Sequence, residues 1–135
     1  MSIRKSTIFA VALVVIVTLF QLFTGGGNTM QIDMGEHSMT FAGIDEFTYE
    51  LVYDDIISAE LVLEPDWKSL GGQEFGPFRV GQISNDSGDK YTLFVTTRCG
   101  NAIEAMLADG SRMIFNYNST ANTENLYEML LKNIQ

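Results

Sequence analysis

The sequence predicts a mainly β domain, an antiparallel two-sheet partial barrel capped by one C-terminal α-helix and preceded by a single N-terminal transmembrane helix. Three observations predict this architecture: an uncharged apolar run near the N-terminus, a series of short runs with alternating apolar residues, and a last segment with apolar residues at helical spacing. The chain has 135 residues. That length leaves room for one compact domain after the apolar run, over residues 30–135.

The apolar run covers residues 7–23, TIFAVALVVIVTLFQLF, which carry no charge and include twelve Ile, Leu, Val or Phe residues. At roughly −0.3 to −0.6 kcal/mol for each such residue near the bilayer centre, they favour insertion by about −4 to −7 kcal/mol. As a helix with a rise of about 1.5 Å per residue, the run reaches roughly 25 Å, close to the thickness of a hydrocarbon core. We therefore expect a transmembrane helix over 7–23.

The orientation of this helix follows from the cations beside it. Arg4 and Lys5 lie in residues 1–6, and no further Lys or Arg occurs before Lys68. The positive-inside bias then places residues 1–6 in the cytoplasm and the domain outside, in a single-pass protein of the cell membrane. A cleaved signal peptide, which would release a secreted domain, is the alternative; no Ala-x-Ala box follows the run, so we prefer the uncleaved anchor. Residues 24–29, TGGGNT, are expected to form a glycine-rich tether.

Beyond the tether the apolar residues recur with a period of two, which indicates short strands. The runs lie at 32–34, 39–41, 47–53, 57–63, 78–80, 91–95, 103–107 and 113–117. Segments rich in Gly, Asn, Asp and Ser separate most of them and are typical of turns, so we expect an antiparallel meander. The longest interruption, 64–77, is expected to cross between the two sheets as a loop, pinned by Trp67 and Phe75.

The last segment changes to a period of four. Leu126, Leu130 and Ile134 fall on one helical face, which predicts a C-terminal amphipathic helix that covers the open end of the sheets. Thr120 or Asn122 is expected to cap its start, with Glu124 in the first turn.

The charge balance excludes several partners. From Gln31 onward the chain has six basic and seventeen acidic residues, a net charge of −11. Nucleic acids and anionic lipid head groups bind clustered Lys and Arg, so neither is expected to bind this domain.

Few residues have the spacing of a catalytic site. Asp54 and Asp55 are adjacent, and adjacent residues of an extended segment point to opposite faces, so we interpret them as a corner between strands that binds backbone N–H groups. His37 is the sole histidine and has no second imidazole ligand. Cys99 is the sole cysteine, which excludes an internal disulfide and predicts a small buried residue near a turn; the alternative is a reactive thiol or an intermolecular bridge.

One acidic turn has some resemblance to an ion site. Asp86 and Asp89 flank Gly88, but the distal Glu of an EF-hand loop is missing. We therefore expect no catalytic, cofactor-binding or metal-binding residue and no cofactor. The alternative is a metal-dependent module or enzyme that uses these acidic loops.

Several segments together are similar to one known family. They are YDDI at 53–56 followed by AELV, FGPFRVG at 75–81, YTLFV at 91–95, DGSRMIFN at 109–116, and the terminal Thr123, Leu126 and Tyr127. Over residues 30–135 the chain resembles the bacterial PH-like (pleckstrin-homology-like) domain family. The resemblance implies seven strands and a closing helix, places YDDI at a turn between strands, and agrees with membrane attachment, which is common in that family.

The resemblance also bears on function. PH domains that bind phosphoinositides use Lys and Arg around the loop between their first two strands, whereas the candidate loops here carry Glu36, Asp45 and Glu46, so this activity is not expected. Docking of a peptide at an exposed sheet edge or in an apolar groove remains. The sequence thus predicts a membrane-anchored, non-enzymatic binding or scaffolding domain that engages another membrane or envelope protein or peptide.

Overall fold

A computed structural model describes residues 28–84 and 86–134, apart from the side chain of Lys68. The described chain divides into two compact units, one up to Tyr53 and the other from Asp54 onward. The predicted cytoplasmic segment 1–6, the predicted transmembrane helix 7–23 and residues 24–27 of the tether lie outside the described residues. Among the described residues, no helix has the length and the hydropathy that a membrane span requires.

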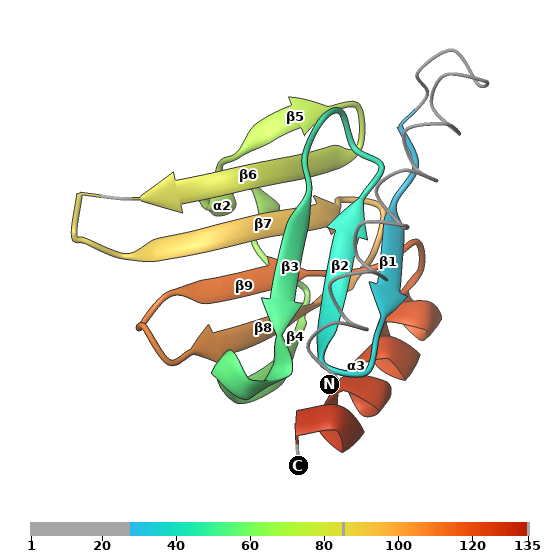
Figure 1. Cartoon of the computed structure of the whole chain (residues 1–135). Helices are drawn as coiled ribbons and strands as arrows, with labels where there is room; N and C mark the ends of the chain where they lie inside the picture. The colour runs from blue at the N-terminus through green and yellow to red at the C-terminus, as the bar shows by residue number, and fades with distance from the viewer. Residues whose placement is uncertain (1–27, 85, 135) are drawn as a thin grey trace. The chain divides into compact units, whose positions relative to one another are not determined.

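The first unit is a three-stranded antiparallel sheet (Figure 1). It comprises β1 (Gln31–Met34), β2 (Ser38–Ala42) and β3 (Tyr49–Val52), in that order. The two strands predicted nearest the tether are therefore both present. β2 lies in the middle and is buried at all five positions, which explains why Met39 and Phe41 contribute large buried side chains.

The start of this unit is held by its own backbone. The N–H of Thr29 donates to the carbonyl of Gly43 over 3.0 Å, and the side-chain oxygen of Asn28 accepts from the N–H of Asp45 over 2.7 Å. Gly43 has φ of +101°, and a Cβ added there would lie 1.8 Å from the Thr29 carbonyl oxygen. Only glycine fits this close approach of two backbone segments.

The second unit is a six-stranded sheet with the order β4-β8-β9-β7-β6-β5 (Figure 1). Its strands are β4 (Ile56–Leu63), β5 (Gln73–Phe75), β6 (Phe78–Ser84), β7 (Lys90–Thr96), β8 (Asn101–Leu107) and β9 (Arg112–Phe115). The prediction of a mainly β chain with two sheets and one long C-terminal helix is confirmed. In the described residues neither sheet closes on itself.

The predicted antiparallel meander is wrong in this second sheet. β9 lies between β8 and β7, and its pairing with β7 is parallel, from Tyr91 opposite Arg112 to Phe94 opposite Phe115. β7 and β8 are consecutive in sequence but are not neighbours. The alternating pattern marks each strand correctly, but it carries no information on which strand lies beside it. Counting both units, the described residues hold nine strands, more than the seven implied by the resemblance.

The segment 64–77 does not cross between the two sheets as expected, because β4 before it and β6 after it belong to the same sheet, and it is more ordered than the expected loop. It contains the short helix α2 (Trp67–Leu70) and strand β5, which forms a hairpin with β6. Trp67 and Leu70 pack against a buried cluster of the sheet that comprises Leu93, Val95, Ala102 and Ile114. The expectation that Trp67 pins this segment is confirmed.

The C-terminal helix α3 spans Thr120–Ile134. Leu126 and Leu130 are buried, as the period of four predicts, and the helix packs against β4 and β8. The predicted cap is wrong, because the hydroxyl of Ser119 accepts from the N–H of Asn122 over 3.1 Å. Glu124 therefore lies beyond the first turn, which has no acidic residue.

Candidate functional site

β4 lies at one end of the strand order and so forms an edge of the six-stranded sheet. Its eight residues, IISAELVL, are rich in β-branched and aliphatic side chains, which favour extended backbone. A 3₁₀ turn, η1 (Tyr53–Asp55), precedes it, and Glu64 with φ of +50° followed by Pro65 ends it. On its inner side β4 pairs antiparallel with β8, with a register shift between Ile56 and Ser58.

Two hydrogen bonds define the direction of the backbone groups along β4. The N–H of Glu64 donates to the carbonyl of Gly100, on the β8 side, over 2.9 Å. Because N–H and C=O directions alternate along a strand, the groups of Glu60 and Val62 also face β8. The groups of Ala59, Leu61 and Leu63 then face outward.

The second hydrogen bond agrees with this assignment independently. The hydroxyl of Tyr127, on α3, donates to the carbonyl of Ala59 over 3.2 Å. That carbonyl therefore points away from β8. Among the described residues no group bonds to the outward N–H or C=O of Leu61 and Leu63. We call the row of outward groups from Ala59 to Leu63 the β4 edge.

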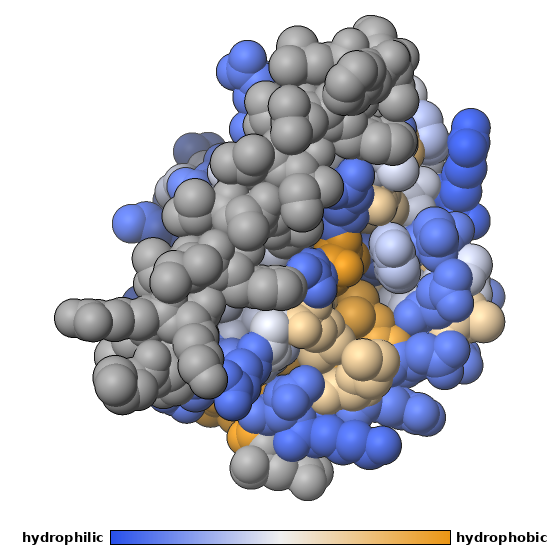
Figure 2. All heavy atoms as spheres, turned by 45° about the vertical axis from the view of Figure 1, so that its right-hand side comes forward, coloured by the Kyte–Doolittle hydropathy of each residue, from blue (hydrophilic) through white to orange (hydrophobic). Residues whose placement is uncertain are grey.

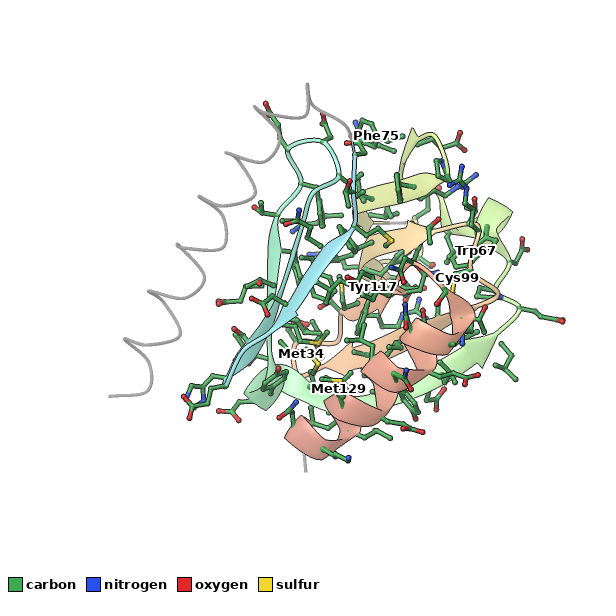
Figure 3. All side chains as sticks on the ribbon, turned by 90° about the vertical axis from the view of Figure 1, so that its right-hand side faces the viewer. Met34, Trp67, Phe75, Cys99, Tyr117 and Met129 are labelled. Carbon is green, nitrogen blue, oxygen red and sulfur yellow. The ribbon has the colours of Figure 1, made fainter. Side chains whose placement is uncertain are left out.

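The side chains of β4 leave its two ends accessible. Ile57 is 67% exposed and Leu63 is 69% exposed, although both are large and apolar. Such exposure on an edge strand is unusual, because unpaired edges with apolar side chains pair readily with other chains. Met129, which lies on α3, is also half exposed (Figure 3).

The surface around these residues is acidic. Asp54, Asp55, Glu60 and Glu64 are all exposed and follow the length of β4. Hydrophilic side chains cover most of the described surface on the face that Figure 2 presents, with a smaller hydrophobic area between them. The chemistry available at the β4 edge is therefore main-chain hydrogen bonding, apolar contact and attraction of cations.

Asp54 and Asp55 lie in the 3₁₀ turn that joins β3 to β4, so their prediction as a corner is confirmed. The hydrogen bonds expected from their carboxylates to backbone N–H groups are not seen among the described residues. Instead, the backbone carbonyl of Asp55 accepts from the N–H of Ala108 over 2.8 Å. This bond ties the start of β4 to the turn after β8.

The sole histidine and the sole cysteine belong to different units. His37 occupies the turn between β1 and β2, and its Nε2 is 3.9 Å from a carboxylate oxygen of Glu36. Cys99 is buried in the turn before β8, as predicted, and its thiol donates to the side-chain oxygen of Asn101 over 3.0 Å. Figure 3 shows Cys99 near the start of α3.

Asp86 and Asp89 lie in the exposed turn between β6 and β7. Over 28–84 and 86–134, no three His, Cys, Asp or Glu side chains come together in a group that could hold a metal ion. The structure therefore brings none of the residues considered for ion binding into a shared donor set.

A buried polar network joins α3 to the sheet, and the sequence patterns did not indicate it. Asn116, fully buried after β9, donates to the carbonyls of Thr96 and Asn101 over 3.0 and 3.1 Å. Its side-chain oxygen accepts from the N–H of Thr96 over 2.8 Å. The hydroxyl of Thr123 accepts from the N–H of Tyr117 over 2.9 Å. These bonds fix the start of α3, and so fix the helix that places Tyr127 at the β4 edge.

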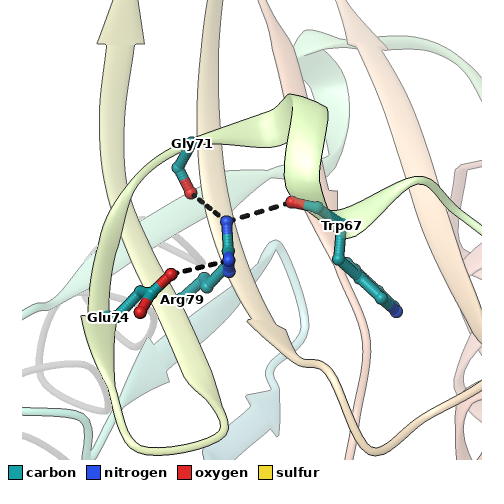
Figure 4. Close-up of polar contacts among 4 residues, drawn as sticks. All are labelled: Trp67, Gly71, Glu74 and Arg79. Carbon is teal, nitrogen blue, oxygen red and sulfur yellow. Dashed lines mark hydrogen bonds and ion pairs between the residues drawn. The ribbon is translucent and has the colours of Figure 1, made fainter.

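A second polar cluster holds α2 onto the sheet (Figure 4). The guanidinium of Arg79 donates to the carbonyls of Trp67 and Gly71 over 3.0 and 3.4 Å and pairs with Glu74 over 2.6 Å. The hydroxyl of Tyr91 donates to the carbonyl of Leu70 over 2.5 Å. The guanidinium of Arg79 therefore provides hydrogen-bond donors for two backbone carbonyls of the glycine-rich segment 64–77.

Two groups have perturbed pKa values. Burial, helped by the nearby carboxylate of Asp33, raises the pKa of Tyr53 to about 12, and its hydroxyl donates to the carbonyl of Gly35 over 2.9 Å. Hydrogen bonds from the hydroxyl and N–H of Ser111 lower the pKa of Asp109. Each group makes a hydrogen bond to a turn residue of its own unit, and neither is part of the β4 edge.

The chain was compared with protein-family models, with curated protein sequences and with solved structures, and none of them matches it.

Proposed function

We propose that this chain is a membrane-anchored, non-enzymatic binding domain that docks an extended segment of another membrane or envelope protein at the β4 edge. The observation that carries the proposal is the row of outward backbone groups at Leu61 and Leu63, which have no partner among the described residues. Exposed edges of this kind accept an added strand through main-chain hydrogen bonds.

The membrane arrangement belongs to the same proposal. Its support is the uncharged run 7–23 preceded by Arg4 and Lys5. A reporter enzyme fused after Gln135, active only outside the cytoplasm, is expected to be active. Activity of a cytoplasm-specific reporter at the same position would overturn the orientation, and recovery of a mature chain lacking residues 1–27 would favour the secreted form.

Membership of the bacterial PH-like family is likewise a proposal. Its support is the set of quoted segments, the two sheets and the single long helix at the C-terminus. The parallel pair β7–β9 departs from the expected meander. The proposed partial barrel with the helix as its cap is part of this interpretation.

The docking proposal is tested in native membranes with the full chain. The photocrosslinker p-benzoylphenylalanine replaces Leu63, which is 69% exposed and tolerates a larger side chain. We expect one specific adduct on irradiation. Leu61→Pro, which removes an outward N–H and blocks the edge with its ring, is expected to abolish that adduct.

Leu61→Ala is the matched control, because it shortens the same side chain and keeps the N–H. It is expected to retain the adduct. An adduct that survives Leu61→Pro would overturn docking by strand addition, as would the absence of any specific adduct in the parent protein.

A further inference from the structure

The β4 edge carries negative charge without a matching cation. Residues 54–65 include four acids, Asp54, Asp55, Glu60 and Glu64, and no Lys or Arg. All four are exposed. An anionic or acidic segment would be repelled along the whole edge, whereas a cationic segment would be attracted.

Glu60 has the most specific environment of these acids. It lies directly opposite Glu104 on β8. Like charges in this cross-strand position are destabilising unless a cation compensates them. Arg112 pairs with Glu104 over 2.9 Å, and its guanidinium lies 5.8 Å from the centre of the Tyr91 ring. Arg112 therefore compensates Glu104, and Glu60 has no ion pair among the described residues.

We infer that the segment docked at the β4 edge is a short basic strand that places a Lys or Arg opposite Glu60. This inference rests on the proposed function and names the chemistry of its partner. The added cation gives a row of charges across four strands in which the two acids, Glu104 and Glu60, each have a cation on their outer side, Arg112 on β9 and the Lys or Arg of the partner. Because the N–H and C=O of Glu60 face β8, its pair with an added antiparallel strand is of the non-hydrogen-bonded type, with side chains close together at about 4.5 Å between Cα atoms.

Tyr127 limits the register of the added strand. Its hydroxyl already occupies the outward carbonyl of Ala59. Leu61 and Leu63 are therefore the two residues whose outward N–H and C=O are both without a described partner, which corresponds to a partner segment of only a few residues. The same charges argue against a second copy of this chain, because two β4 strands side by side would bring Glu60 and Glu64 against acids of the same kind.

The test uses the full chain in micelles of a neutral detergent and two fluorescein-labelled peptides, with binding followed by fluorescence anisotropy. The basic probe is Thr-Val-Lys-Val-Lys-Val-Thr, and the acidic probe has Glu at both Lys positions. We expect the basic probe to bind about tenfold more tightly or better, since two favourable contacts replace two repulsive ones. Glu60→Lys is expected to reverse this preference.

Asp86→Lys is the matched charge control, because it makes the same change in net charge at an exposed turn between β6 and β7. It is expected to leave the preference unchanged. Equal weakening of the basic probe by both variants would overturn the inference, because attraction would then depend on net charge alone. Equal binding of the two probes to the parent protein would overturn it as well.

Leu61→Pro and Leu61→Ala separate this inference from the proposed function. Loss of basic-probe binding in Leu61→Pro but not in Leu61→Ala supports docking at the β4 edge. If Glu60→Lys nevertheless leaves the preference for the basic probe unchanged, the inferred contact with Glu60 is wrong and the proposed function stands. Binding that is undiminished in Leu61→Pro overturns both proposals. Absence of binding by either probe at millimolar concentration overturns both as well.

Discussion

The phenol of Tyr127 on α3 donates a hydrogen bond over 3.2 Å to the backbone carbonyl of Ala59 on β4, 68 residues earlier in the chain. The helix thus satisfies one outward backbone group of the edge strand. The outward N–H and C=O groups of the next two outward-facing residues, Leu61 and Leu63, have no partner among the described residues. Partial protection of an edge is a common way to limit unwanted pairing. Under the proposed function, it also defines where the docked strand would begin.

Removal of this phenol is expected to weaken the contact between α3 and β4. Tyr127→Phe leaves the ring in place and removes the donor, so the free energy of unfolding should fall by about 0.5–1.5 kcal/mol. Urea denaturation in detergent micelles measures the change. Tyr117→Phe is the control, because no described residue bonds to the Tyr117 hydroxyl, and equal losses in both variants would contradict this assignment.

Proline substitutions distinguish the two sides of β4. Val62→Pro removes an N–H that faces β8 and should cost about 2–4 kcal/mol in the free energy of unfolding, since a ladder bond is lost and its carbonyl partner stays unsatisfied. Leu63→Pro removes an outward N–H from an exposed residue and should cost less than about 1 kcal/mol. The same denaturation measurement compares them. Similar costs at both positions would mean that the assigned directions are wrong.

The attachment of α2 can be followed through Trp67, the only tryptophan of the chain. Arg79→Met removes the donors to the carbonyls of Trp67 and Gly71, which should cost about 1–2 kcal/mol and loosen the packing of the indole. We expect the fluorescence emission of Trp67 to shift to longer wavelength. Arg98→Met, at an exposed turn, should leave the emission unchanged. An unchanged spectrum for Arg79→Met would show that α2 is held by apolar packing alone.

Alkaline pH should destabilise the chain through Tyr53. Its folded-state pKa is raised from 10.0 to about 12, so its contribution is fully present below pH 10 and is lost as the pH rises towards 12. The contribution amounts to about 2–3 kcal/mol. Tyr53→Phe should therefore show a smaller fall in the free energy of unfolding between pH 10 and 12 than the parent protein. Parallel falls in the two proteins would exclude Tyr53 as the titrating group.

The sequence predicts the elements of this fold better than their pairing. Alternation located eight of the nine strands because their apolar residues recur at every second position, as in β8, where Ile103, Ala105 and Leu107 are buried and Glu104 and Met106 between them are less buried. It missed β5, whose three residues lie between glycines and show no period. It also missed the parallel pair β7–β9, because strand order depends on contacts distant in sequence.

For the candidate site, too, the sequence shows the residues but not how they are paired. Leu61 and Leu63 belong to an alternating run that would look alike in a central strand and in an edge strand. Only the position of β4 in the sheet, together with the bonds of Glu64 and Tyr127, reveals which backbone groups are open. The acids around β4 were visible in the sequence, but the opposition of Glu60 to Glu104 required the register.

Residue-resolved amide hydrogen exchange of β4, measured by NMR on the isotopically labelled full chain in detergent micelles, tests the open edge most directly. The N–H groups of Glu60 and Val62 bond to β8 and should exchange slowly, whereas those of Leu61 and Leu63 should exchange at nearly the rate of an unprotected amide. Alternating protection along these four residues is the predicted result. Uniformly slow exchange at all four would contradict it, because the β4 edge would then already be paired.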